Sequence, residues 1–103
     1  MSGRSATPNQ AKTLRDLAQH FYALKDVLRL EMIALLADRR ECTVNEMAAA
    51  LKKSQPLVSW HLRRLKTAGV VRIRRAGREV YCSLDRDALV RSQQAFLDLL
   101  GPS

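Results

Sequence analysis

Long apolar runs, cysteines and aromatic residues are scarce in this sequence of 103 residues, of which 5% are aromatic. No stretch approaches the roughly 18 apolar residues that a membrane-spanning helix needs. Residues 1–8 lack the apolar segment of a secretory signal. Two cysteines, Cys42 and Cys82, are too few for a disulfide scaffold. We therefore expect a cytoplasmic protein that does not associate with membranes.

Catalytic motifs are also lacking. The sequence has no Ser/His/Asp arrangement, no glycine-rich phosphate loop and no paired-carboxylate signal, so we do not expect an enzyme. His20 and His61 stand alone, without the spacing of a metal-binding cluster. We therefore predict no cofactor and no tight structural or sensory metal site.

The composition is that of a folded protein, with 47% hydrophobic and 27% charged residues. The length suits one domain and is too short for two. Residues 1–8 are small and polar, which predicts a flexible tail. The remaining residues, 9–101, are expected to form a single domain.

Acidic residues are missing from one long stretch of the chain. The whole sequence has 18 Lys and Arg against 10 Asp and Glu, a net charge of +8. All of this excess lies between Lys52 and Arg78, where basic residues occur without a single acid. Such a concentrated block is typical of a surface that binds a polyanion. A solvated positive face is the simpler alternative.

Apolar spacing and capping residues predict five helices and a hairpin. We expect helices at 9–24, 28–36, 44–51, 55–68 and 86–100, and strands at 70–75 and 79–84. The expected N-caps are Asp26 for the second helix, a Thr43–Glu46 capping box for the third, Ser54 or Gln55 for the fourth and Asp85 for the last.

This order of elements predicts a mainly α fold with a small antiparallel hairpin. Two short helices joined by a tight turn form a helix-turn-helix unit, and the arginine-rich hairpin that follows forms a wing at 72–79. The fold class is therefore a winged helix-turn-helix with a two- to three-stranded sheet. The helix pair alone would also fit an ordinary helical corner.

The helix at 55–68 is predicted to place Val58, Leu62 and Leu65 in the core, because these positions share one face. The residues that we expect to contact DNA are Ser54, Gln55, Pro56, Leu57, Ser59, Trp60, Arg63 and Arg64, with Arg74, Arg75 and Arg78 of the wing. Trp60 either contacts DNA or packs under the wing. His61 lies beside the core, where a backbone hydrogen bond is a better prediction than metal ligation.

Three segments resemble the ArsR-type (ArsR/SmtB-like) winged helix-turn-helix regulators. They are residues 21–30 (FYALKDVLRL), 54–71 (SQPLVSWHLRRLKTAGVV) and 77–84 (GREVYCSL). The resemblance implies a homodimeric transcriptional repressor whose first and last helices, 9–24 and 86–100, form the dimer interface. Two recognition helices would then read an inverted-repeat operator.

The sequence departs from that family at several positions. Thr43 and Asn45 stand where the metal sensors of the family have a Cys-x-Cys pair, and these side chains are poor ligands for soft ions. Lys52 replaces a common turn glycine, which is mildly costly if its φ is positive. Pro56 and Leu57 replace a small polar pair.

The two cysteines are expected to be neighbours, because in winged-helix folds the short strand before the third helix pairs with the second hairpin strand. A reversible Cys42–Cys82 disulfide would then act as a redox switch. Alternatively, both thiols are small buried apolar groups. Weak or two-coordinate binding of a thiophilic ion also stays open.

The leading functional interpretation is a sequence-specific regulator that binds double-stranded DNA in the cytoplasm, at the nucleoid. A non-specific architectural or RNA-binding winged helix is the alternative that charge alone permits, and a protein-interaction module is a third. A thiol-redox-responsive repressor is the minority alternative.

Overall fold

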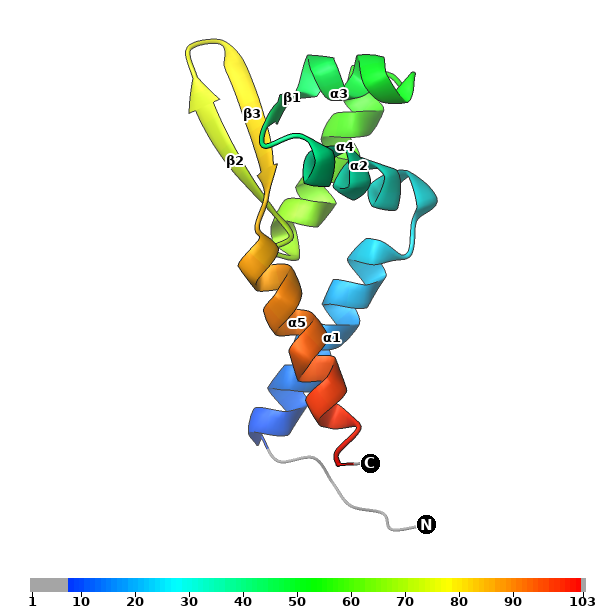
Figure 1. Ribbon diagram of the computed structural model, residues 1–103, viewed down its shortest axis with the longest axis vertical. Coiled ribbons are helices and arrows are strands. Elements are labelled where there is room, and N and C mark those ends of the chain that lie inside the picture. Colours follow the sequence, from blue (N-terminus) through cyan, green and yellow to red (C-terminus); the bar gives the residue numbers. More distant parts are fainter. Residues whose placement is uncertain (1–7, 103) are drawn as a thin grey trace.

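The computed structural model describes residues 8–102, so most of the expected tail, 1–7, lies outside the described residues. The elements follow the predicted order (Figure 1): α1 (Pro8–Leu24), α2 (Val27–Asp38), β1 (Cys42–Thr43), α3 (Val44–Leu51), α4 (Gln55–Thr67), β2 (Val71–Ala76), β3 (Glu79–Leu84) and α5 (Arg86–Leu99). The predicted fold class, a winged helix-turn-helix with five helices and a three-stranded sheet, is confirmed.

Polar side chains begin four of the helices. The Asp26 carboxylate accepts a hydrogen bond from the Leu28 amide, and the Asp85 carboxylate accepts one from the Ala88 amide. Thr43 and Glu46 form the predicted capping box, with each side chain bound to the other residue's backbone amide. Ser54, rather than Gln55, caps α4.

The turn between α3 and α4 depends on a left-handed residue. Lys52 adopts φ 56° and ψ 45°, and the amides of Lys52 and Lys53 donate to carbonyls of the last turn of α3. The positive φ anticipated at this position is therefore present in a residue with a Cβ, at a modest conformational cost.

The sheet has the order β1-β3-β2, with both pairings antiparallel. Cys42 pairs with Cys82 across β1 and β3, so the prediction that the two cysteines are neighbours is confirmed. On the other side of β3, Ile73 pairs with Cys82. The two-residue strand β1 thus ties the start of α3 to the wing.

The core lies between α2, α3, α4 and the sheet. The predicted stripe of α4 is confirmed, since Val58, Leu62 and Leu65 are all buried. They pack in one cluster with Met32, Leu36, Met47, Val70 and the two cysteines.

A buried arginine joins three helices beside this core. Arg29 of α2 is only 3% exposed, and its Nε donates to Nδ1 of His61 on α4 at 3.0 Å. Its Nη1 donates to the carbonyls of Tyr22 and Ala23, in the last turn of α1. The negative end of the α1 dipole and two carbonyl oxygens thus stabilise a buried cation.

The expectation that His61 hydrogen-bonds to the backbone is wrong, because its partner is the Arg29 side chain. Its Nδ1 accepts a hydrogen bond and therefore carries no proton. Burial lowers the pKa of His61, nearby Asp26 raises it, and the Arg29 charge lowers it further. The imidazole is held neutral in the folded protein.

Helices α1 and α5 lie side by side at the end of the molecule away from the hairpin tip (Figure 1). Phe21 and Phe96 meet edge to face, with ring centroids 5.1 Å apart. No residue of α5 is fully buried within the chain. Large apolar side chains remain exposed on these two helices: Leu14, Phe21, Tyr22, Val90, Leu97 and Leu99. Among the described residues, no helix is long and apolar enough to cross a membrane.

We predict that the free energy of unfolding falls as the pH is lowered from about 7 to about 5. The folded-state pKa of both His61 and His20 lies below the unfolded value, mainly because of burial, so the unfolded chain binds protons first. Each histidine contributes at most about 1.4 kcal/mol per pH unit. Urea unfolding across this range measures the slope.

A His61→Gln variant keeps a hydrogen-bond acceptor for Arg29 but does not titrate, so its slope should be smaller than that of the wild type. His20→Gln is the matched control for the second histidine. An unchanged slope in His61→Gln would show that His61 is not held neutral by folding.

Candidate nucleic-acid interface

The free face of α4 carries the predicted recognition residues. Ser54, Gln55, Pro56, Leu57, Trp60, Arg63 and Arg64 are exposed, and Ser59 is half-buried. The turn before α4 and the tip of the hairpin lie at the end of the molecule opposite the α1–α5 pair (Figure 1). The basic turn before α4 and the basic hairpin tip therefore lie at the same end of the molecule.

Trp60 lies among cations, on the flank of α4 that faces α2. The Arg64 guanidinium lies 4.8 Å from the indole centroid, and the Arg29 guanidinium lies 5.6 Å from it. The His61 ring meets the indole edge to face at 4.9 Å. The indole is still 41% exposed, so it connects the buried Arg29–His61 pair to the outer face of the helix.

The arginines of the wing divide into two groups. Arg74 forms a two-pronged salt bridge with Glu41, with N–O distances of 2.8 and 3.1 Å, and its guanidinium lies over the Tyr81 ring. The hydrogen bond from Arg74 lowers the pKa of Glu41. Arg72 pairs with Asp85 at 3.3 Å. Both contacts join the hairpin to the rest of the domain.

Arg75 and Arg78 form the second group. Both are exposed, and within the described part of the chain neither forms an ion pair. The prediction grouped Arg74 with them at the hairpin tip, but Arg74 pairs with Tyr81 in the register and Glu41 already holds its guanidinium. Among the described residues, Arg75 and Arg78 are therefore the wing arginines without an ion-pair partner.

Two exposed lysines beside α4 were not among the predicted site residues. Lys52 and Lys53 occupy the turn directly before the N-cap of α4. They belong to the basic block noted in the sequence, and their place in the turn was the signal that could have selected them. Arg29 was also overlooked, although it falls within the segment 21–30 that carries the family resemblance.

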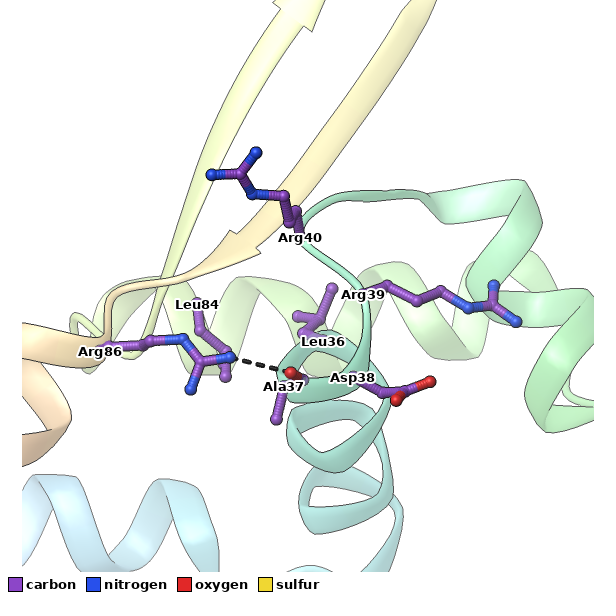
Figure 2. Close-up of a pocket in the computed structure, with 7 residues that line it drawn as sticks. All are labelled: Leu36, Ala37, Asp38, Arg39, Arg40, Leu84 and Arg86. Atoms are coloured by element: carbon purple, nitrogen blue, oxygen red, sulfur yellow. Dashed lines mark hydrogen bonds between the residues drawn. The ribbon is translucent and has the colours of Figure 1, made fainter.

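An open hollow of about 280 Å³ lies between the end of α2 and the junction of β3 with α5. Its lining residues are Leu36, Ala37, Asp38, Arg39, Arg40, Leu84 and Arg86. Figure 2 shows Arg86 turned toward the Ala37 carbonyl, to which it donates at 2.9 Å, while Arg39 and Arg40 point in different directions. The three guanidinium groups do not converge on a common ligand.

The positions that replace the family's thiolate pair have structural partners. The Thr43 hydroxyl accepts the Glu46 amide as part of the cap of α3. Among the described residues, no group of three or more His, Cys, Asp or Glu side chains is placed to hold a metal ion.

Comparison with known proteins assigns the family. Residues 26–72 match the family described as bacterial regulatory protein, arsR family. The chain is 44% identical over 89 residues to a transcriptional repressor SmtB homolog of Synechocystis, covering 86% of this chain and 67% of that protein. It is 35% identical to a cadmium resistance transcriptional regulatory protein CadC homolog of Staphylococcus aureus, over 80% of this chain and 69% of that one.

Solved structures show the same fold. The homodimeric winged helix-turn-helix DNA-binding domain of a possible ArsR-family regulator from Mycobacterium bovis superposes with a TM-score of 0.75 at 28% identity, covering 96% of this chain and 90% of that domain. An ArsR-like transcriptional regulator from Rhodococcus superposes with a TM-score of 0.78 at 26% identity, covering 85% and 82%.

The fold and the exposed basic helix define a winged helix-turn-helix DNA-binding protein. The chain belongs to the arsR family of bacterial regulatory proteins, as its sequence resemblance predicted, and is a DNA-binding transcriptional regulator. This family consists of regulators rather than enzymes, in agreement with the sequence prediction.

We predict that the aromatic ring of Trp60 contributes to the free energy of unfolding through its cation–π contacts. Trp60→Phe keeps a π surface for Arg29 and Arg64, whereas Trp60→Leu removes it. The leucine variant should therefore lose about 0.5–1 kcal/mol more unfolding free energy than the phenylalanine variant. Urea unfolding followed by circular dichroism measures the difference, because both variants lack the chain's single tryptophan. Equal stability of the two variants would contradict the cation–π assignment.

Proposed function

We propose that this chain is a dimeric transcriptional repressor that reads an inverted-repeat operator with α4 and contacts the flanking DNA with the wing. The observation that carries the proposal is the free face of α4, where Arg63 and Arg64 are exposed, together with the exposed wing arginines Arg75 and Arg78. Such a repressor acts in the cytoplasm, at the nucleoid. The SmtB homolog of Synechocystis, itself named a repressor, supports this interpretation.

Each part of the surface has a distinct proposed role. Arg63 and Arg64 lie along the exposed face of a helix that fits the major groove, where a guanidinium can donate to guanine. Arg75 and Arg78 of the wing, with Lys52 and Lys53 of the turn, are placed for phosphates, which position the protein without reading sequence. Ser54, Gln55, Pro56, Leu57, Ser59 and Trp60 complete the proposed contact surface, and Arg74 contributes to it only if it leaves Glu41.

Dimerisation through α1 and α5 is supported by the apolar surface that these helices expose. An amphipathic helix with no buried residue leaves its apolar side chains in water unless a partner covers them. The related domain from Mycobacterium bovis is described as homodimeric. A twofold axis between the α1–α5 pairs would place two copies of α4 on successive major grooves, about 34–36 Å apart.

The non-specific alternative differs from the proposal in its sequence preference. A non-specific architectural or RNA-binding winged helix would bind through charge alone and discriminate little between duplexes. Burial raises the pKa of Cys82 to about 11 and leaves little thiolate on that residue, so thiol-redox control would depend on Cys42 as the nucleophile.

Fluorescence anisotropy with the duplex upstream of the protein's own gene, and with a shuffled duplex of equal length, tests the proposal. Between about 50 and 200 mM salt, affinity for both should fall, while the preference for the upstream duplex persists. Equal affinity for the two duplexes at every salt concentration would favour the architectural alternative.

We predict that Arg63→Ala or Arg64→Ala weakens binding to the preferred duplex by about 1–3 kcal/mol where the residue contacts a base, and relaxes sequence preference. Arg75→Ala or Arg78→Ala should weaken binding to every duplex and reduce the salt slope by about 1 for each lost phosphate contact. Arg72→Ala is the matched wing control, because Asp85 already pairs with Arg72. If the Arg72 variant alone changed the slope, the division of wing arginines would be wrong.

We predict that Leu97→Glu on α5 converts the dimer to a monomer, because it would bury a charge at the interface. Leu57→Glu, an equally apolar exposed position on α4, should leave the dimer intact. Sedimentation at micromolar concentration distinguishes the two. A wild-type monomer, or dissociation by the Leu57 variant instead, would contradict the proposed interface.

A further inference from the structure

Cys42 and Cys82 lie directly opposite each other in the sheet. They are register partners on the antiparallel strands β1 and β3, both thiols are free, and their residues are 1% and 0% exposed. Side chains of directly opposed residues leave the sheet on the same face, with Cα atoms about 4.5–5.5 Å apart. Two thiols therefore meet on one buried face.

The surroundings of this pair combine apolar groups with one cation. The thiols belong to the buried cluster that includes Leu36, Met47 and Val58. Nη1 of Arg39 lies 3.9 Å from Sγ of Cys42, within reach of a hydrogen bond to sulfur. The Arg39 guanidinium therefore places one positive charge beside the pair.

We propose that Cys42 and Cys82 form a two-coordinate thiolate site for a soft monovalent cation of the copper(I) or silver(I) type. On binding, the two thiols release two protons and two sulfur–metal bonds form, without any change of oxidation state. The bound group carries one negative charge, which the Arg39 guanidinium offsets.

The ligand set selects this class of ion. Thiolates prefer soft metals such as copper(I). A structural zinc ion needs four ligands, and the described residues provide no group of three. Further donors in the buried cluster are thioethers, those of Met32 and Met47, which are also soft. The composition of the site therefore favours a soft ion with few ligands over hard and borderline divalent ions.

Cys82 is a poor nucleophile for disulfide formation, although the strand geometry suits a disulfide as well as an ion. Disulfide formation requires a thiolate as nucleophile. Burial is the main cause that raises the pKa of Cys82 to about 11, with further contributions from the charges of Cys42 and Glu41. A soft ion displaces the thiol proton directly, because the sulfur–metal bond compensates for the cost of deprotonation.

Arg39 also connects the site to solvent. It lines the open hollow at the end of α2 together with Leu36, which packs in the same cluster as the cysteines (Figure 2). An ion would enter beside Arg39, because residues 37–41, directly before Cys42, are all exposed. Because Cys42 directly precedes the cap of α3 and Cys82 is part of the wing, occupancy would link both proposed DNA-binding elements.

Titration of reduced protein with silver(I) under anaerobic conditions tests the site, with free methionine as a competing thioether. Native mass spectrometry should show one ion per chain, and thiolate-to-metal absorption should saturate at that ratio. Cys42→Ala and Cys82→Ala should each abolish the binding that survives the competitor, whereas zinc(II) should not bind the wild type. Circular dichroism and thermal unfolding establish that the variants fold.

X-ray absorption at the silver edge of the loaded wild type keeps the test decisive if a variant fails to fold, and it should show a shell of sulfur atoms alone. Four outcomes would each overturn the proposal. The first two are retention of the ion by either folded single variant and a nitrogen or oxygen ligand in the X-ray absorption data. The other two are equal binding of zinc and an air-formed disulfide with no ion uptake by the reduced protein. Because these measurements involve no DNA, they are independent of the proposed function.

Discussion

The placement of the recognition helix depends on one buried cation. Arg29 has no carboxylate partner among the described residues and is held instead by the last carbonyls of α1 and by His61 of α4. A buried guanidinium is tolerated only where its donors are satisfied. Three helices must therefore keep their relative positions for this charge to remain buried, and His61 must stay neutral.

The same interaction extends to the surface. His61 packs edge to face on Trp60, and the guanidinium groups of Arg29 and Arg64 both lie near the Trp60 ring. The inner flank of α4 is thus joined through one indole to a side chain proposed to meet DNA. The wing follows a similar logic, since Arg72 and Arg74 attach the hairpin to Asp85 and Glu41, while Arg75 and Arg78 remain free.

Sequence reasoning succeeded where the determining interactions are local. Asp26, Thr43 and Asp85 were predicted as caps because a cap needs only its own side chain and an amide two or three residues away. The stripe of Val58, Leu62 and Leu65 followed from helical periodicity. The pairing of Cys42 with Cys82 was also anticipated, but from the topology expected of winged helices rather than from the two residues themselves.

Sequence reasoning failed where the partners are distant in the chain. Arg29 and His61 are separated by 32 residues, and Arg74 and Glu41 by 33, so neither spacing nor composition reveals their pairing. His61 was accordingly assigned a backbone partner, and Arg74 was grouped with the free arginines of the tip. Both departures arise because tertiary packing determines which polar groups a buried or half-exposed side chain can reach.

The central claim is that a rigidly placed α4 reads DNA sequence in a twofold-symmetric dimer. Selection of the wild-type protein's preferred sites from a pool of random duplexes tests both parts of that claim at once. We predict enrichment of one short sequence repeated in inverted orientation, with centres about one helical turn, 10–10.5 base pairs, or a multiple of it apart. A bound pool without any shared sequence, or with single unpaired sites, would contradict the account.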